Sequence, residues 1–196
     1  MPIRLWNTSR ILHSEHEIKT EFYLVGSGAK NLVTRDGNGP FDLDYNLRIL
    51  EMPNRCWNDL KNLKDTVRDS LNRIVKKTLF SDGQDSKSVI TSNLVLKNAP
   101  QKEFSFDIAI LARMGNGNLC RLIHNKQNGL FTGCEVPCSK DLGGKVLALK
   151  QHGWWGDVRE TYLKKKNMYL SRRDYNHPSF VVYVETINEI YQKARK

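Results

Sequence analysis

A small turn and the two carboxylates that follow it are the residues of this chain best suited to chemistry. A short apolar run, Phe22-Tyr23-Leu24-Val25, ends in the flexible turn Gly26-Ser27-Gly28, which carries one hydroxyl. Asp42 and Asp44 follow on a segment in which apolar and polar residues alternate. Because successive side chains of a strand point to opposite faces, the two carboxylates share one face and leave the other face to a core. Adjacent carboxylates repel each other, so a hard divalent cation, Mg²⁺ or Mn²⁺, is the expected partner.

A third carboxylate, Asp107, interrupts the apolar alternation of a second predicted strand at residues 102–111. The two faces of this strand are Phe104, Phe106, Ile108 and Ile110 on the apolar side and Ser105, Asp107 and Ala109 on the other. A single acid on an interior strand needs a partner, because an unpaired buried charge is costly. A metal ion shared with the other two carboxylates would provide one. A salt bridge or backbone hydrogen bonds are the alternatives.

In this order, Gly26-Ser27, Asp42-x-Asp44 and Asp107 resemble the signature of the DNA polymerase beta-like nucleotidyltransferase superfamily. The resemblance covers about residues 20–111. It implies an α+β fold, with a mixed or antiparallel sheet packed on helices and a C-terminal helical segment. It also implies that Asp42, Asp44 and Asp107 are catalytic and hold two Mg²⁺ or Mn²⁺ ions. The Gly-Ser turn would hold the triphosphate, and Gly28 and Lys30 would add a backbone N–H group and a positive charge.

The activity implied by this resemblance is a metal-dependent transfer of a nucleoside monophosphate from a nucleoside triphosphate to an acceptor hydroxyl, with release of pyrophosphate. The acceptor is open: another nucleotide, an RNA end, a small molecule such as an antibiotic, or a protein hydroxyl. The long intervals between the motifs resemble the branch that makes oligonucleotide second messengers, although this chain is shorter than most such synthases. One alternative is a non-catalytic nucleotide- or RNA-binding module with the same fold. Another is an α+β domain whose aspartates are merely salt-bridged.

The composition of the 196 residues, 39% hydrophobic and 27% charged, is typical of a soluble globular protein with one main domain. No apolar run is long enough to span a bilayer, and the first residues lack a secretory signal, so we expect a cytoplasmic protein without a membrane partner. The formal net charge of +10 favours nucleotides or nucleic acid as partners, or is ordinary surface charge. Cysteines and a histidine near residue 130 are more consistent with structural roles than with a zinc site (Cys120, His124, Cys134 and Cys138).

The pattern along the chain predicts a catalytic core at residues 1–152 and a C-terminal helical lobe at residues 153–196. The clearest helix is expected at residues 58–80, with basic residues that include Lys61 and Lys64 facing outward. His124, on a predicted strand, could contact substrate or be structural. The lobe offers aromatic residues that could stack on a base and basic residues that could contact phosphate; core packing and surface exposure are the alternatives. These residues are Trp155, Tyr162 and Tyr169, and Lys164, Lys165, Lys166, Arg172 and Arg173.

Overall fold

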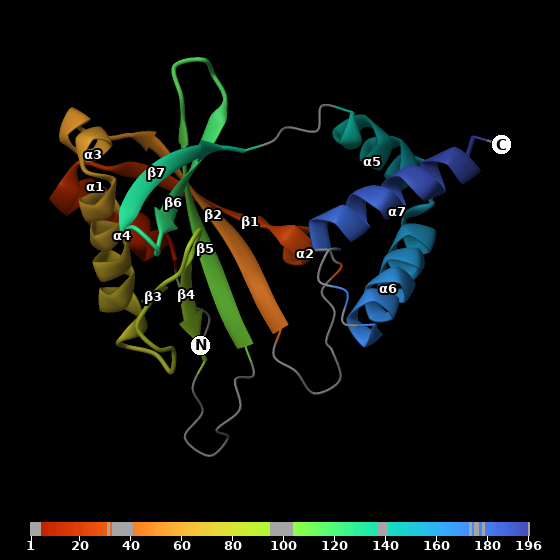
Figure 1. Ribbon diagram of the computed structural model, residues 1–196, viewed down its shortest axis with the longest axis horizontal. Coiled ribbons are helices and arrows are strands. Elements are labelled where there is room, and N and C mark those ends of the chain that lie inside the picture. The colour runs from red at the N-terminus through yellow and green to blue at the C-terminus, as the bar shows by residue number, and fades with distance from the viewer. Residues whose placement is uncertain are drawn as a thin grey trace.

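The computed structural model describes residues 5–30, 32, 41–94, 104–136, 141–172, 174, 177 and 179–195 (Figure 1). The helices are α1 (Trp6–His16), α2 (Gly26–Ala29), α3 (Asn54–Asn58), α4 (Leu60–Val75), α5 (Leu142–Gln151), α6 (Trp155–Ser171) and α7 (Ser179–Lys193). The strands are β1 (Lys19–Val25), β2 (Phe41–Glu51), β3 (Gln84–Asp85), β4 (Ile90–Asn93), β5 (Phe104–Arg113), β6 (Leu119–Asn125) and β7 (Leu130–Glu135). The predicted α+β class with a C-terminal helical segment is confirmed. Across the described ranges, every helix is too short or too polar to cross a membrane.

The strands form one seven-stranded mixed sheet with β5 at its centre. On one edge β5 pairs with β2 in parallel, and β2 pairs in turn with β1 in the antiparallel sense. On its other edge, the first half of β5 pairs with β4 and the second half with β6, both antiparallel. Most residues of β5 are buried, which fits its apolar sequence and its position between three other strands. The turns predicted at Gly115–Asn118 and Asn128-Gly129 join β5 to β6 and β6 to β7.

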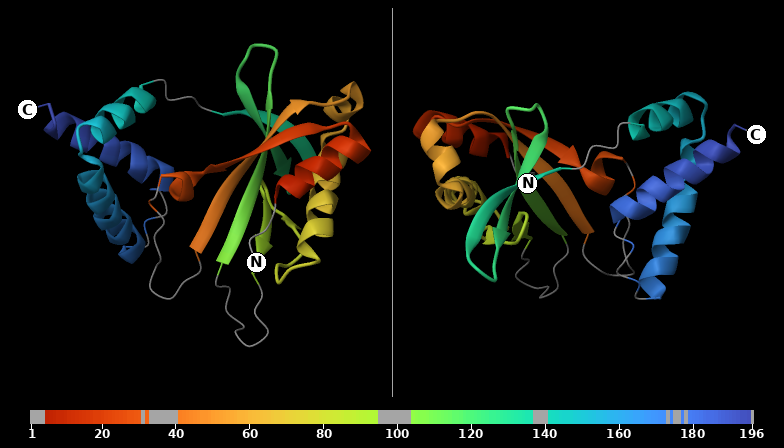
Figure 2. Two further views of the ribbon diagram at one scale, coloured as in Figure 1. Left: turned by 180° about the vertical axis from the view of Figure 1, so that it is seen from behind. Right: turned by 45° about the horizontal axis from the view of Figure 1, so that its top comes forward.

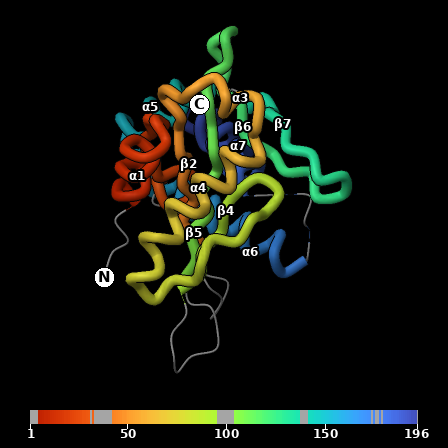
Figure 3. The backbone as a smooth tube through the Cα atoms, turned by 90° about the vertical axis from the view of Figure 1, so that its left-hand side faces the viewer, coloured from red at the N-terminus to blue at the C-terminus, as the bar shows by residue number. Residues whose placement is uncertain are grey.

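Helices α1 and α4 cover one face of the sheet (Figure 3). Their apolar residues form the main core with the strands: Leu12, Leu63, Val67, Leu71 and Val75 pack with Leu47, Phe106, Ile108 and Ile110. The helix predicted at residues 58–80 is shorter in the structure. It begins at Leu60, where Asp59 caps α4 by accepting a hydrogen bond from the Asn62 N–H at 2.8 Å, and it ends at Val75. Of the strand predicted at residues 87–97, β4 covers Ile90–Asn93, and residues 95–97 lie outside the described residues.

Helices α5, α6 and α7 form a separate lobe beside the open edge of the sheet (Figure 2). A second hydrophobic cluster lies within this lobe and takes in Leu149 of α5, Tyr162 of α6 and Ile187 of α7. Leu32, which follows α2, also belongs to this cluster. The predicted division at residue 152 stays a prediction. In the structure α5, which precedes that residue, shares its core with α6 and α7.

Lys64 corrects one expectation from the sequence. Instead of facing solvent it is buried, with 3% of its side chain exposed. Its Nζ lies 2.5 Å from Asp85 Oδ1 and donates to the Ser86 carbonyl oxygen at 2.7 Å. His124 Nδ1 lies 2.5 Å from the other oxygen of Asp85, and its ring stacks on Phe131 at 4.1 Å. Helix α4 is thereby tied to β3 and β6 through Asp85, which contacts the buried Lys64 and the partly buried His124.

Replacement of Lys64 by Met is expected to lower the free energy of unfolding by about 3–5 kcal/mol, because it leaves the Asp85 carboxylate without its buried partner. The matched control is Lys61→Met, which removes an exposed ion pair with Asp65 on the same helix and should cost about 0.5 kcal/mol or less. Urea unfolding followed by circular dichroism measures both. Equal effects of the two substitutions would contradict this account of Lys64.

Candidate active site

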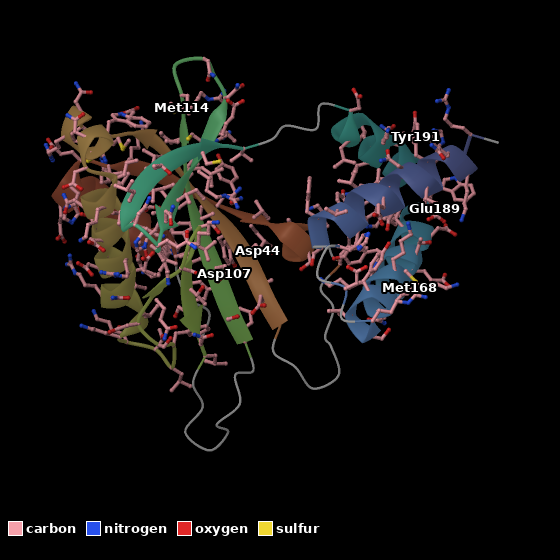
Figure 4. The ribbon with its side chains drawn as sticks, in the orientation of Figure 1. Asp44, Asp107, Met114, Met168, Glu189 and Tyr191 are labelled. Carbon is pink, nitrogen blue, oxygen red and sulfur yellow. The ribbon has the colours of Figure 1, made fainter. Side chains whose placement is uncertain are left out.

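The parallel pairing of β2 and β5 brings two of the predicted carboxylates side by side. Asp44 pairs directly with Asp107 in the register of the two strands, and Asp42 pairs with Ser105. Neighbouring strands lie about 4.8 Å apart, so paired side chains on one face are in close contact. Figure 4 shows Asp44 and Asp107 next to each other near the middle of the sheet. The structure therefore brings together residues that are 63 positions apart in the sequence.

Hydroxyl groups on the neighbouring strands orient the outer two carboxylates. The Ser105 hydroxyl donates a hydrogen bond to Asp42 across the β2–β5 pair. The Thr91 hydroxyl donates to Asp107 Oδ1 at 2.5 Å across the β4–β5 pair. Such partners fix the direction of a carboxylate. Neither hydroxyl was singled out from the sequence, because its partner is set by strand register.

The Gly-Ser turn lies against Asp44. Val25, the last residue of β1, pairs with Asp44, so the chain turns into α2 directly beside that carboxylate. Gly26 has φ +61°, and a Cβ atom built on it would overlap the Asp44 carboxylate. At Gly28 a Cβ would lie 2.7 Å from Leu43 Cδ2. Gly26, with its positive φ, is therefore needed for the turn to approach β2 this closely, whereas a side chain at Gly28 would require the end of Leu43 to move.

The electrostatics of Asp44 indicate an excess of negative charge. Burial raises the pKa of Asp44, and the charges of Asp107 and Asp42 raise it further. The charges of Lys30 and Arg121 oppose this shift without reversing it. Additional positive charge beside Asp44 would therefore be favourable.

Two lysines of different elements face this negative charge. Lys30 follows α2, donates to the Gly26 carbonyl oxygen at 3.0 Å and lies over the Tyr183 ring at 4.7 Å. Lys166 of α6 donates to the Ser179 hydroxyl at the start of α7. Burial lowers the pKa of both lysines, whereas the charge of Asp44 raises it in each case. A bound anion beside these ammonium groups would favour their charged forms.

Two adjoining cavities meet at Asp44. The smaller, about 280 Å³, is lined by the Gly-Ser turn and by residues of the lobe, which are Tyr162, Ser179, Phe180 and Tyr183. The larger, about 610 Å³, is lined by Asp44, Asp107, Arg121 and Cys134, together with apolar residues of the sheet. Gly26, Lys30, Asp44 and Phe180 line both. The site therefore has room for two ligands in contact with the same carboxylate.

The other candidates from the sequence lie in different settings. Tyr162 is buried beside the smaller cavity, and burial together with the Asp44 charge raises its pKa, which the Ser179 hydrogen bond opposes. Tyr169 stacks on His177 at 4.0 Å, the Trp155 ring lies 4.7 Å from Lys150 Nζ, and Lys165 pairs with Glu185 and Glu189. Lys164 and Arg172 are exposed, and Arg173 and Cys138 lie outside the described residues. His124 is held by Asp85, as a structural histidine would be.

Arg121 was not identified from the sequence, although it lines the larger cavity. Its neighbours in the sequence gave no sign of this, since one arginine on a predicted strand is ordinary. Its position follows from the register, because Arg121 pairs with Leu111, which shares a strand face with Asp107 and Ala109.

Gly26→Ala is expected to displace the Asp44 carboxylate and to weaken any ligand that Asp44 holds, at least about tenfold for a lost charged contact. Gly129→Ala is the matched control, because Gly129 also has positive φ but no atom within 4 Å of a Cβ built there. Gly129→Ala should lower the free energy of unfolding by about 1–2 kcal/mol, which is the cost of the backbone strain alone. Nucleotide titration and urea unfolding of both variants separate the two effects. A Gly26→Ala protein that binds like the wild type would contradict the proposed contact with Asp44.

No sequence family and no curated protein matches this chain. The fold, however, matches solved structures of DncV from Vibrio cholerae. The complex of this di-nucleotide cyclase with GTP and 5MTHFGLU2 has a TM-score of 0.60 at 10% identity and covers 89% of this chain. The 3′-deoxy ATP-bound form has a TM-score of 0.59 at 11% identity, and the GTP-bound form 0.58 at 13%, each also covering 89% of this chain.

This chain spans less than half the length of those proteins, with 49%, 46% and 45% of them covered, respectively. Because the match covers 89% of this chain, it takes in parts of both the sheet and the helical lobe. DncV belongs to the DNA polymerase beta-like nucleotidyltransferases. The chain therefore has the fold of the DNA polymerase beta-like nucleotidyltransferase superfamily, as its motifs indicated.

Proposed function

We propose that this protein transfers a nucleoside monophosphate from a nucleoside triphosphate to an acceptor hydroxyl. The observation that carries the proposal is the meeting of Asp44, Asp107 and the Gly26 turn at the junction of two cavities. Lysines from two further elements face the same point. The matching solved structures contain GTP or 3′-deoxy ATP, which supports a nucleoside triphosphate as the ligand.

In the proposed reaction, the acceptor oxygen forms a bond to the α-phosphorus as the bond between that phosphorus and the bridging oxygen breaks. Pyrophosphate leaves, and the proton of the hydroxyl passes to Asp107. The Gly26-Ser27 turn, Gly28 and Lys30 bind the triphosphate, and Lys166 adds charge on the same side. Such a reaction depends on positioning and charge neutralisation rather than on covalent participation by the protein.

The residues present fit a divalent cation, although among the described residues no group of three or more His, Cys, Asp or Glu side chains is arranged around a metal position. All the donors are hard carboxylate oxygens, and the pKa of Asp44 is raised first by burial and then by the charges of Asp107 and Asp42. Asp42, Asp44 and Asp107 would hold two Mg²⁺ or Mn²⁺ ions. When bound, these ions would neutralise charge on the reacting phosphate.

Calorimetric titration with ATP, GTP, CTP and UTP, each with and without Mg²⁺, tests the site. We expect Mg²⁺-dependent binding of at least one nucleotide to the wild type and its loss in Asp44→Asn, because the carboxylate that lines both cavities is gone. Asp82→Asn, an exposed position, should bind like the wild type. Pyrophosphate release in the presence of an acceptor separates the enzyme from a binding module of the same fold. Binding that is equal in wild type and Asp44→Asn would refute the proposal.

The stability of the fold provides a second readout of the charge at Asp44. Its raised pKa means that Asp44 contributes stability below the unfolded pKa of about 3.9 and loses it as the pH rises through the folded pKa. Without metal at pH 7, Asp44→Asn should therefore be more stable than the wild type, on the order of 1 kcal/mol. This gain should shrink as the pH falls towards 4.

Mg²⁺ should reverse that order, since an ion that binds only the folded state stabilises the wild type and not Asp44→Asn. Urea unfolding at several pH values, with and without Mg²⁺, measures both effects. Asp82→Asn is again the control and should stay within about 0.5 kcal/mol of the wild type. A wild type that gains no stability from Mg²⁺ would argue against the metal site.

A further inference from the structure

Arg121 stands apart from the other cations around Asp44. Lys30 and Lys166 both line or face the side of the site formed by α2 and the lobe, and each donates to a protein oxygen. Arg121 lies on β6, on the other side of the Asp44–Asp107 pair, and lines only the larger cavity of the two. Its charge reaches Asp44, where it lowers the pKa.

The register of the sheet fixes where Arg121 points. It pairs with Leu111 on β5 and with Cys134 on β7, so these three side chains share one face. Leu111 lies two and four residues beyond Ala109 and Asp107 on the same strand, and hence on the same face. Arg121 is therefore on the face of the sheet that bears the carboxylates, on the next strand out from Asp107.

The guanidinium of Arg121 has unused donor capacity. Its Nε is buried and has no hydrogen-bond partner among the described residues. A guanidinium has five N–H donors in a planar fork that matches a phosphate or carboxylate, and a buried donor left unpaired is costly. The rest of this side of the cavity is largely apolar, with Val89, Ala109, Ile123, Val136 and Phe180. A small ligand with one anionic group and an apolar or aromatic body fits this lining.

We infer that Arg121 binds a phosphate group of the acceptor, so that the acceptor is a small phosphorylated molecule of mononucleotide size. This inference rests on the proposed function, because it assigns the larger cavity to the acceptor and the smaller one to the triphosphate. A phosphate there would otherwise be repelled by Asp44, Asp107 and the nearby Glu135, which also lines the cavity and accepts from Asn118 at 2.7 Å. Arg121 offsets this repulsion and selects for the phosphate.

Cys134 makes the inference testable without turnover. It is exposed, lines the same cavity and is the cross-strand neighbour of Arg121, so a ligand on Arg121 will shield its thiol. The experiment measures the alkylation rate of Cys134 by N-ethylmaleimide, read by peptide mass spectrometry, against increasing concentrations of each 5′-mononucleotide and of the matching nucleoside. Cys56 on α3, outside the cavity, is the internal reference.

At least one mononucleotide should slow alkylation of Cys134 while its nucleoside does not. Arg121→Gln should weaken this protection at least about tenfold, the loss expected for a charged hydrogen bond. Arg121→Lys, which keeps the charge but not the fork, should retain part of it. Arg113→Gln is the matched control, because Arg113 is exposed at the end of β5 and donates to the Gly117 carbonyl oxygen. It should protect like the wild type.

Equal protection by nucleoside and mononucleotide, or no protection by either, would overturn the inference. So would protection by a short RNA alone, since that would assign the cavity to a polymer. If Arg121→Gln does not fold, Arg121→Lys is used in its place. Protection of Cys134 by the mononucleotide at the same concentrations as in the wild type would then contradict a phosphate held by the planar guanidinium.

The outcomes for the two proposals are separable. One outcome is that Arg121 is needed for the protection of Cys134, while no nucleotide shows Mg²⁺-dependent binding that Asp44→Asn abolishes. This outcome would support the phosphate site and refute the proposed nucleotidyltransferase activity. Mg²⁺-dependent binding of a nucleoside triphosphate without Arg121-dependent protection would refute only the role of Arg121.

Discussion

The parallel pairing of β2 with β5 is the constraint on which the site depends. It forces the Asp44 and Asp107 side chains into adjacent positions on one face of the sheet, where their charges repel. A sheet whose only need was stability would place an apolar pair there, because β5 is otherwise an apolar strand in the main core. The surrounding groups accommodate these charges. Hydroxyls donate to Asp42 and Asp107, Gly26 has no side chain that would overlap the Asp44 carboxylate, and three cations face Asp44.

The helical lobe completes the site from outside the sheet. It has its own hydrophobic cluster, so it does not depend on the main core for its packing. Leu32 joins this cluster only a few residues after the Gly-Ser turn, which ties the turn to the lobe as well as to β1. Lys166 and Ser179 face the carboxylates from the lobe side. The position of the turn and the position of the lobe are therefore coupled.

Much of the sheet side of the site was predictable from the sequence, because its signals are local. Alternation predicted β2 and β5 and their faces, and the run of small residues after the first apolar segment predicted the turn that follows β1. Lys64 was predicted wrongly because helical periodicity cannot tell that β3 would bring a carboxylate to that face of α4. Arg121, Thr91 and Ser105 could not be found, since cross-strand register is set by long-range pairing.

Some residues line both cavities, and others line only one of them. Asp44 lines both, so a change in its charge acts on both ligands at once. Tyr162 and Ser179 line only the smaller cavity, and both belong to the lobe. Arg121 and Cys134 line only the larger one, and both belong to the β6–β7 hairpin. Under the proposed function, substitutions at residues that line one cavity alone alter the ligand of that cavity, whereas Gly26, Lys30, Asp44 and Phe180, which line both, act on the two ligands together.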